Sequence, residues 1–513
     1  MSLLQAMRRH ARFRAREVAM IEGETQHDWR RFEDRVLRLA EGLRSLGVGR
    51  GDRIGILALN SRAYLEAECA IWAAGAVIVP MNIRWSTAEN GYAIEDSNIR
   101  VLFADRNFLT EAELLRTARD DLLIVGIDAE GAAGDVVSEQ LIKASDRAPE
   151  YEPAPKDLAG IFYTGGTTGR SKGVMLSHGA MWINSISVAM ATGIGEEDRL
   201  LHTAPLFHVA GGIMLQAGLV SGSTHIFMPR FVADQLVRNV EQQKVTKLLI
   251  LPTMVQMMME DKTYAPAKLQ SLNGLLFGGS PMPEPILARL KEDLPQVSLV
   301  HTYGQTEMGP AISFLHPRWQ FVGSPKGLSV GTPFTTVEVK VVDADGHPVA
   351  LGEVGEIWAR GPGQMTGYLN KPEETAKAIT EDGWVRTGDI AYQDEDGFLY
   401  ICDRAKDMII TGGENVFSGE VENVILRHPA VREAAVVGIP DDEYGEAVHA
   451  VLVLHEGAEI ELQALRDHCR AEIAPYKSPR SLEIRATLPL SPTGKVLKRD
   501  LRAPFWENRS TAV

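Results

Sequence analysis

Strand and helix patterns alternate along the first hundred residues, and this alternation constrains the fold of the chain more than any other feature. Apolar residues recur at helical spacing after Trp29, and we expect Gly47 to end this helix. The predicted elements are, in order, a helix over 29–46, a strand over 53–59, a helix over 61–74, a strand over 76–80, a helix after Ser86 and a strand over 101–104. Such alternation predicts an α/β domain with a largely parallel sheet.

The chain changes character twice after this region. The α/β pattern continues through a helix at 178–191 and strands at 224–228, 247–251 and 275–277. Short strands and Gly/Asp turns over 330–401 then predict a β-rich subdomain. The final segment predicts a small α+β domain with helices at 420–427 and 462–473 and strands at 434–438 and 447–454. A chain of 513 residues is too long for one core, and we expect a large N-terminal domain over 1–403 and a small C-terminal domain over 404–513.

The charge and the cysteines limit the class of protein. A net charge of −15 argues against a nucleic-acid or membrane-surface binder, because both partners are anionic. Cys69, Cys402 and Cys469 form no metal-binding pattern, which favours a reducing compartment, and we expect a cytoplasmic protein. The apolar run over 69–81 is shorter than the roughly 20 residues that span a bilayer. Residues 1–20 predict an amphipathic helix, with a transit peptide as the alternative.

One short stretch has the composition of a polyphosphate-binding loop. Residues 163–174 read Tyr-Thr-Gly-Gly-Thr-Thr-Gly-Arg-Ser-Lys-Gly-Val and follow a predicted strand over 158–163. Glycines let successive backbone N–H groups point into one concavity, hydroxyls add donors, and Arg170 and Lys172 supply positive charge for phosphate oxygens. Ligands bind at strand ends in α/β proteins, so this loop is the candidate phosphate site.

The loop matches neither of two common phosphate-binding motifs. The nucleoside-triphosphatase loop needs Lys and then Ser or Thr directly after its last glycine, whereas Gly169 is followed by Arg170, Ser171 and Lys172. The dinucleotide fingerprint needs a glycine pattern that opens a helix, which this stretch does not fit. A flexible surface turn is the alternative interpretation.

Six motifs, in this order and spacing, resemble those of the adenylate-forming superfamily of acyl-CoA synthetases, peptide-synthetase adenylation domains and firefly-type luciferases. They are residues 163–174, 303–307 (Tyr-Gly-Gln-Thr-Glu), 387–389 (Thr-Gly-Asp), 403–407 (Asp-Arg-Ala-Lys-Asp), 412–415 (Gly-Gly-Glu-Asn) and 492–495 (Pro-Thr-Gly-Lys). The resemblance covers nearly the whole chain. Two positions depart from it, because Gly166 stands where the family usually has Ser and Ser171 where it often has Pro.

The resemblance implies an enzyme that activates a carboxylic acid. The carboxylate attacks the α-phosphate of ATP to give an acyl-adenylate and pyrophosphate, and coenzyme A then displaces AMP to give a thioester. Two anions must meet in the first step, so cations and oriented dipoles should provide most of the rate enhancement. The implied partners are ATP, Mg²⁺, coenzyme A and a small carboxylic acid, without nucleic acid or an integral membrane segment. A homodimer and a peripheral membrane association stay open.

The resemblance also implies the residues that bind the nucleotide. The β- and γ-phosphates would be held by Thr164, Gly165, Gly166, Thr167, Thr168, Gly169 and Lys172. Thr306 would donate to the α-phosphate, and Glu307, with Thr167, would bind Mg²⁺. Gly279, Ser280 and Tyr303 would pack around the adenine, with Gly304 in the same nucleotide-binding set. Asp389 would accept the ribose hydroxyls, and Arg404 would add a ribose or phosphate contact.

The resemblance places a moving lysine at the far end of the chain. Lys495 would bridge the attacking carboxylate and the α-phosphate and is the principal candidate for adenylation. Lys406 occupies the position of the family's hinge, where rotation would withdraw Lys495 and bring in the coenzyme A-binding residues Gly412, Gly413 and Glu414. The implied architecture is therefore a large layered α/β domain with a small hinged lobe.

The acyl substrate is less constrained by the sequence. Amino-acid-activating relatives carry an Asp where this chain has Phe-His-Val at 207–209, so an amino acid is disfavoured. The predicted acyl pocket consists of His208, Val209, Gly211, Gly212, Gly278 and His301. His208 would gate the acyl tunnel or flank the carboxylate, and a core histidine is the alternative. The stretch 408–415 is similar to fatty-acyl-CoA synthetases and to bacterial feruloyl-type synthetases, and we favour a medium- or long-chain fatty acid over an aryl or phenylpropanoid acid.

Two other classes of function are compatible with parts of the sequence. A luciferase-like oxygenase would share the same adenylation residues. A non-catalytic nucleotide-binding scaffold would have lost Glu307 or Lys495, and both are present.

Overall fold

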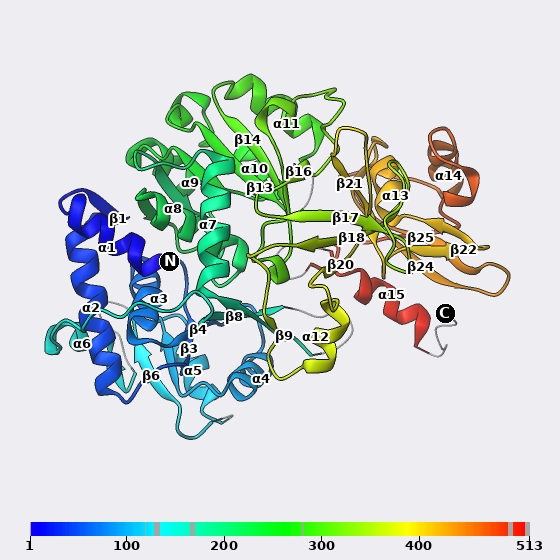
Figure 1. Ribbon diagram of the computed structural model, residues 1–513. Helices are drawn as coiled ribbons and strands as arrows, with labels where there is room; N and C mark the ends of the chain where they lie inside the picture. Colours follow the sequence, from blue (N-terminus) through cyan, green and yellow to red (C-terminus); the bar gives the residue numbers. More distant parts are fainter. Residues whose placement is uncertain are drawn as a thin grey trace. The chain divides into compact units, whose positions relative to one another are not determined.

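The computed structural model describes residues 2–117, 119–127, 134–164, 170–279, 282–490 and 496–507. The chain folds into two compact units, and Figure 1 shows their elements. The first unit comprises Met1–Val339 and Ala359–Arg386, and the second comprises Lys340–Trp358 and Thr387–Val513. The predicted boundary at residues 403 and 404 lies inside the second unit, and a mobile lobe that starts there stays a prediction.

The first unit contains a nine-stranded sheet with the strand order β16-β15-β14-β13-β12-β10-β11-β1-β2. Its strands are β1 (Val18–Glu22), β2 (Thr25–Asp28), β10 (Arg199–His202), β11 (Thr224–Phe227), β12 (Lys247–Leu249), β13 (Gly274–Gly278), β14 (Ser298–Tyr303), β15 (Ser313–Leu315) and β16 (Thr332–Pro333). The strands from β14 to β1 in this order run parallel, and antiparallel pairs occur at the two edges. The predicted parallel α/β arrangement is confirmed.

A second sheet of the first unit has the order β19-β9-β8-β4-β3-β5-β6-β7. Its strands are β3 (Arg53–Leu57), β4 (Val77–Pro80), β5 (Val101–Ala104), β6 (Leu123–Gly126), β7 (Val136–Val137), β8 (Leu158–Thr164), β9 (Lys172–Ser177) and β19 (Gly367–Tyr368). β9 pairs antiparallel with β8 and with β19. The sequence placed Lys172 in a loop, but strand β9 begins there because Val174 and Leu176 alternate into the core.

Helices form three layers around these two sheets. The buried residues of one core come from both sheets and from the helices between them, which are α1 (Leu3–Phe13), α2 (Trp29–Ser45), α3 (Arg62–Ala74), α7 (His178–Thr192) and α8 (Val209–Ser221). α9 (Ala233–Gln243), α10 (Pro252–Glu260) and α11 (Glu284–Asp293) cover the outer face of the nine-stranded sheet (Figure 1). α4 (Thr87–Ser97) and α5 (Leu109–Leu115) cover the outer face of the second sheet, and α6 (Ser138–Ala144) packs on α2.

The second unit is an α+β fold, as the sequence predicts. Its sheet has the order β23-β22-β25-β24, with β26 alongside β25. The strands are β22 (Ile409–Thr411), β23 (Glu414–Val416), β24 (Val431–Asp441), β25 (Gly445–Leu454) and β26 (Ser481–Ile484). α13 (Ser418–Ile425) and α14 (Leu462–Arg470) cover one face, and α15 (Lys498–Trp506) covers the other.

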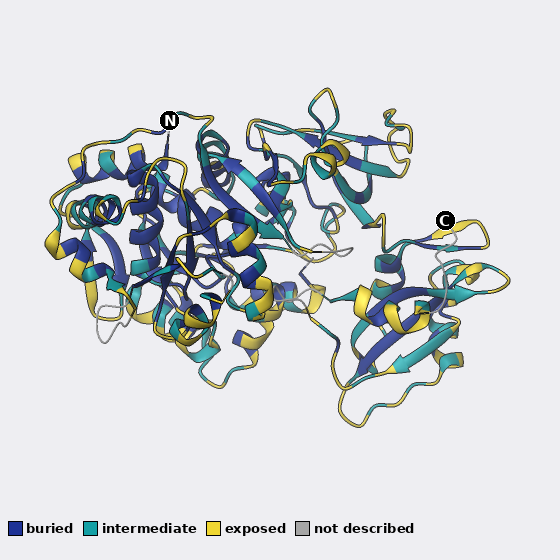
Figure 2. Ribbon diagram, turned by 90° about the horizontal axis from the view of Figure 1, so that it is seen from below, coloured by how far each residue is buried: buried dark blue, intermediate teal, exposed yellow. Residues whose placement is uncertain are grey.

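The predicted β-rich region forms a four-stranded sheet with the order β17-β18-β20-β21. These strands are β17 (Glu338–Val342), β18 (Gly355–Arg360), β20 (Val385–Gln393) and β21 (Leu399–Arg404), and α12 (Pro372–Ala378) lies between β19 and β20 in the chain. Buried residues follow the strands of each unit, and exposed residues concentrate in loops and on outer helix faces (Figure 2).

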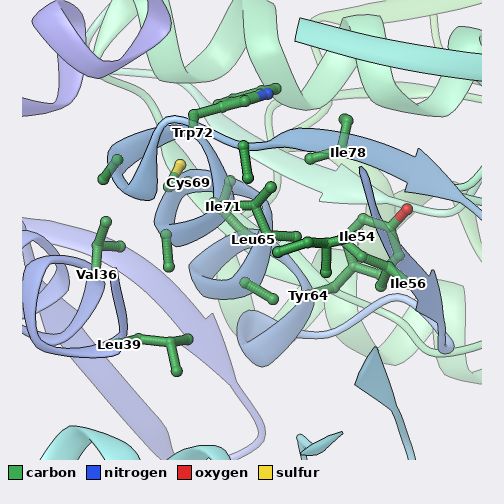
Figure 3. Packing of buried hydrophobic residues seen from close by; sticks show 14 of the residues in the cluster. Val36, Leu39, Ile54, Ile56, Tyr64, Leu65, Cys69, Ile71, Trp72 and Ile78 are labelled. Carbon is green, nitrogen blue, oxygen red and sulfur yellow. The ribbon is translucent and has the colours of Figure 1, made fainter. Parts of the chain in front are cut away.

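The core of the first unit holds strand β8, which ends where the predicted phosphate loop begins. Trp72 of α3 is fully buried among apolar residues of α2, β3 and β4 (Figure 3). Its Nε1 donates to the carbonyl of Ala159 on β8 at 2.9 Å. A buried indole N–H needs such an acceptor. Trp72 therefore holds β8 next to α3 through this hydrogen bond, in addition to the apolar area that its ring buries.

Two carboxylates of α3 are buried in contrasting surroundings. Burial alone would raise the pKa of Glu66, but its hydrogen bond with His27 and its ion pairs with Arg62 and Arg35 outweigh burial and lower that pKa to about 2. Glu68 is only 2% exposed and accepts from Gln216 Nε2 at 3.1 Å. Burial raises the pKa of Glu68 to about 7.

The Glu68 carboxyl should make stability depend on pH. It holds its proton in the folded state up to about pH 7 but loses it near pH 4.5 in the unfolded chain, so folding stability should fall as pH rises through this interval. Glu68→Gln keeps an acceptor for Gln216 without a titrating group. We expect the variant to gain up to about 3 kcal/mol over the wild type between pH 4.5 and 7, with no further gain above pH 7.

Calorimetric melting of the wild type and Glu68→Gln from pH 4.5 to 8.5 measures this difference. Glu95→Gln, on the exposed side of α4, is the matched control and should leave the pH profile unchanged. A Tm difference between Glu68→Gln and the wild type that stays constant with pH would contradict the assignment.

Candidate active site

The two ends of the predicted phosphate loop face each other in the first unit. Thr164 at the end of β8 pairs with Lys172 at the start of β9, and the Thr164 hydroxyl donates to the Lys172 carbonyl at 3.4 Å. Gly165, Gly166, Thr167, Thr168 and Gly169 lie outside the described residues. Thr164 therefore lies at the strand end where the predicted loop begins, and Lys172 lies at the strand end where it finishes.

The Lys172 ammonium lies between an acid and an aromatic ring. Its Nζ is 2.6 Å from Glu374 Oε2 on α12 and 4.9 Å from the centre of the Tyr368 ring. The hydrogen bond from Lys172, together with that from Lys377, lowers the pKa of Glu374 to about 2, so this carboxylate is charged at neutral pH. Cation–π contact and an ion pair both stabilise an ammonium. Sequence reasoning did not identify Glu374 or Tyr368.

The same tyrosine reaches the predicted magnesium ligand. The Tyr368 hydroxyl donates to Glu307 Oε1 at 2.8 Å, and the Met365 N–H donates to the Glu307 carbonyl at 2.8 Å. Burial and the Glu307 charge raise the pKa of Tyr368 well above its ordinary value, so the hydroxyl keeps its proton. Glu307 follows the buried Thr306 in a short 3-10 turn, η2 (Thr306–Met308). The structure thus brings Lys172 and Glu307 to one tyrosine.

A buried asparagine holds the Glu307 turn in place. Asn184 of α7 is 1% exposed, and its Nδ2 donates to the carbonyls of Met308 and Gly363, at 3.2 and 2.9 Å. One amide therefore joins α7, the turn after β14 and the segment that leads to β19. Nothing in the local sequence pattern around Asn184 indicates this role, since a polar residue on a helix is usually solvated.

Two predicted nucleotide-binding glycines, Gly304 and Gly279, and Gly278 of the predicted acyl pocket lie at positions that favour glycine. A Cβ atom on Gly304 would lie 1.5 Å from the Pro310 carbonyl oxygen, and one on Gly278 would lie 2.6 Å from that of Thr302. Gly279 has a φ of +81°, a left-handed conformation that favours glycine. Tyr303 ends β14 and packs against Met308 and Ile312 of the same unit. Ser280 lies outside the described residues.

The predicted acyl-pocket residues gather at the start of α8 and on β14. His208 is half-buried and directly precedes α8, which begins at Val209. A Cβ atom on Gly211 would lie 2.2 Å from the Pro205 carbonyl oxygen, whereas one on Gly212 would meet nothing nearer than 3.6 Å.

His301 lies in a different environment from the α8 residues. It is buried on β14, where its ring stacks on Phe277 at 4.8 Å, and burial lowers its pKa to about 4. His301 is therefore a neutral histidine that contacts the core, and its role as a pocket residue stays a prediction.

The second unit brings together the two predicted ribose ligands. Asp389 of β20 pairs with Arg404 of β21, and Arg404 Nε is 3.4 Å from Asp389 Oδ1. The Asp389 carboxylate is buried, while Arg404 is exposed. Gly388 adopts a left-handed φ of +71°, and its N–H donates to Glu356 Oε1 at 2.9 Å. These bonds fix the turn that presents Asp389.

The predicted coenzyme A-binding residues form a hairpin tip. Gly412 and Gly413 connect β22 and β23 with φ values of +61° and +83°, and both glycines and Glu414 are exposed. A two-residue hairpin turn with two positive φ values strongly favours glycine at both positions. Lys406 is exposed in the turn after β21, and its carbonyl accepts from Arg502 Nη1 at 3.3 Å. Lys495 lies outside the described residues.

Comparisons with known proteins identify the family of the chain. Residues 7–369 match the family model of the AMP-binding enzyme, and residues 420–495 match that of the AMP-binding enzyme C-terminal domain. Within the described residues, no helix combines the length and apolar character needed to cross a membrane.

Individual relatives align over almost the full length of the chain. Feruloyl-CoA synthase of Amycolatopsis sp is 36% identical over 97% of this chain and 98% of its own. Indoleacetate–CoA ligase of Aromatoleum aromaticum is 33% identical over 98% of each chain. The solved structure of o-succinylbenzoate CoA synthetase from Bacillus subtilis, in complex with its acyl-adenylate intermediate, superposes with a TM-score of 0.84, with 31% identity and 97% coverage of both chains.

Removal of the Asn184 amide should loosen the Glu307 turn. Asn184→Ala leaves two carbonyls without a donor, at a cost of about 1–3 kcal/mol. We expect the N–H groups of Gly309 and Met365, which donate to Thr306 and Glu307 carbonyls, to exchange with solvent about tenfold faster or more. Hydrogen exchange measured by mass spectrometry tests this. Asn239→Ala on α9 is the control, because that amide bonds only within its own helix, and equal exchange in both variants would refute the role.

Proposed function

The chain belongs to the AMP-binding enzyme family and is an acid–thiol ligase, and from this premise we propose that it activates an aromatic carboxylic acid with ATP and transfers the acyl group to coenzyme A. The observation that carries the proposal is the joint position of Lys172 and Glu307 on Tyr368. A cation for phosphate oxygens and a carboxylate for a divalent cation are the groups that a nucleoside triphosphate requires.

The described residues fit the nucleotide and its metal. Thr164 and Lys172 would bind the β- and γ-phosphates, while Asp389 and Arg404 would bind the ribose. The Glu307 carboxylate offers the hard oxygen donors that Mg²⁺ prefers, and the Tyr368 hydrogen bond to Oε1 leaves its second oxygen for a cation, while the Thr306 hydroxyl would donate to the α-phosphate. When bound, Mg²⁺ would neutralise charge on the phosphates.

The reaction would proceed in two displacements. A carboxylate oxygen forms a bond to the α-phosphorus of ATP while the bond to the leaving pyrophosphate breaks. The coenzyme A thiolate then forms a bond to the acyl carbon, and AMP leaves with the shared electron pair. Lys495 would stabilise the charge of the first transition state, and rotation at Lys406 would exchange it for the Gly412–Gly413 turn in the second.

An aromatic acid has more support than the fatty acid that the sequence favoured. Feruloyl-CoA synthase, indoleacetate–CoA ligase and o-succinylbenzoate CoA synthetase are named for acids that carry a ring. Helix α8 also lies tightly against its surroundings. A Cβ atom on Gly218 would lie 2.5 Å from Leu200 Cδ1 of β10, so neither an alkyl chain nor a ring has space between α8 and β10 there.

A substrate panel tests the proposal. AMP release that depends on coenzyme A should be measured with ferulate, indoleacetate, benzoate, octanoate and palmitate. We expect kcat/KM for the preferred aromatic acid to exceed that for either fatty acid by at least about tenfold. A misfit of a single methylene group in an apolar pocket is enough to cause a difference of this size. A preference for palmitate would restore the fatty acid, and AMP release without any acid present would argue against a ligase.

The role of Lys495 separates the two half-reactions. Lys495→Ala should slow adenylate formation by about 10²–10³-fold, the usual effect of one electrostatic donor, and should affect thioester formation from pre-formed adenylate far less. Pyrophosphate exchange measures the first step, and thioester release from synthetic acyl-adenylate measures the second. Lys498→Ala, three residues further on, is the control, and an equal loss in both steps for Lys495→Ala would exclude this role.

A further inference from the structure

Tyr368 contacts both charged groups to which the proposed function assigns the triphosphate and its cation. Its hydroxyl is hydrogen-bonded to Glu307, and its ring faces the Lys172 ammonium. Tyr368 is only 8% exposed, so both contacts are made by a buried residue and not by a mobile surface side chain. A phenol that donates to a carboxylate and offers its ring face to an ammonium can hold both charges at fixed positions.

The backbone of Tyr368 is held on two sides. In the pairing of β19 with β9, Tyr368 lies opposite Val174, two positions along β9 from Lys172, and the N–H of Leu369 donates to the Gly173 carbonyl at 2.8 Å. The N–H of Tyr368 donates to Thr375 Oγ1 of α12 at 2.9 Å. The Tyr368 ring therefore has little freedom to move if the Lys172 ammonium or the Glu307 carboxylate shifts.

The two charges also have other partners from neighbouring elements. Glu374 of α12 is ion-paired with Lys172 and with Lys377, at 2.6 and 3.1 Å. Among the described residues no cation pairs with Glu307, and the Tyr368 hydroxyl is the one side-chain donor to its carboxylate. Without that hydroxyl, the Glu307 carboxylate would lose the bond that fixes which of its oxygens faces a cation.

We infer that Tyr368 is a positioning residue that orients the Glu307 carboxylate for a divalent cation and keeps the Lys172 ammonium apart from it. The inference rests on the proposed function, because that function assigns a cation to Glu307 and phosphates to Lys172. Without the ring, the ammonium and the carboxylate could pair directly, and each would be less available to the nucleotide.

Equilibrium ATP binding as a function of Mg²⁺ tests the inference without reliance on turnover. Tyr368→Phe keeps the ring and removes the hydroxyl. We expect the Mg²⁺ concentration for half-maximal ATP binding, measured by titration calorimetry, to rise about tenfold, the effect of losing one hydrogen bond to a charged group. The Kd for ATP at saturating Mg²⁺ should stay within about twofold of the wild type. Tyr368→Leu, which also removes the ring, should weaken ATP binding even at saturating Mg²⁺.

A second tyrosine offers a matched control. Tyr264 donates to Asp293 at 2.7 Å on the outer side of the nine-stranded sheet, so Tyr264→Phe removes the same kind of bond away from the site. It should change Tm but not the Mg²⁺ dependence. If Tyr264→Phe shifts the Mg²⁺ dependence as much as Tyr368→Phe, the effect is one of general stability and the inference is wrong.

A Glu307→Gln background completes the design. If Tyr368 acts through Glu307, adding Tyr368→Phe to Glu307→Gln should cause no further change in the Mg²⁺ dependence. Additive changes would overturn the inference. A wild type that binds no ATP at any Mg²⁺ concentration would overturn the proposed function and this inference together, whereas normal Mg²⁺ dependence in Tyr368→Phe would overturn the inference alone.

Discussion

Strand β9 forms hydrogen bonds with β8 on one side and with β19 on the other, and the charged groups of the first unit depend on this pairing. The pairing of β9 with β8 sets Lys172 opposite Thr164, and its pairing with β19 brings Tyr368 beside them from almost two hundred residues further along the chain. A one-residue slip in either register would turn alternate side chains to the opposite face of the sheet. The register is fixed because Val174 and Leu176 must face the core.

The two charged groups of the first unit have different kinds of partner. Lys172 is paired with Glu374, and Glu307 accepts from a neutral tyrosine. In the second unit, Asp389 is likewise paired with Arg404. Hydrogen bonds from Lys172 and Lys377 lower the pKa of Glu374, whereas burial raises the pKa of Glu68, whose hydrogen-bond partner is the Gln216 amide. An anionic nucleotide would compete with Glu374 for Lys172.

Sequence periodicity predicted those features that have local causes. The helix at 29–46 and the strand at 101–104 agree with α2 and β5, because their apolar spacing reflects a buried face. Lys172 and Glu307 were singled out because each lies in a motif, and their binding roles stay predictions. Tyr368 and Asn184 were missed, since their partners lie far away in the chain and neither residue departs from ordinary local composition. Their contacts with distant parts of the chain become visible only in the folded structure.

The glycines of α8 link the fold to the question of the substrate. At Gly211 and Gly218 the helix approaches the preceding turn and β10 so closely that a methyl group would collide with Pro205 and Leu200. Gly211 belongs to the predicted acyl pocket, but at this position the missing side-chain volume is occupied by the protein itself. Gly212 differs, because a Cβ atom there would find ordinary space. Of the two α8 glycines in the predicted acyl pocket, Gly211 is therefore required by the packing of the chain, whereas Gly212 is not.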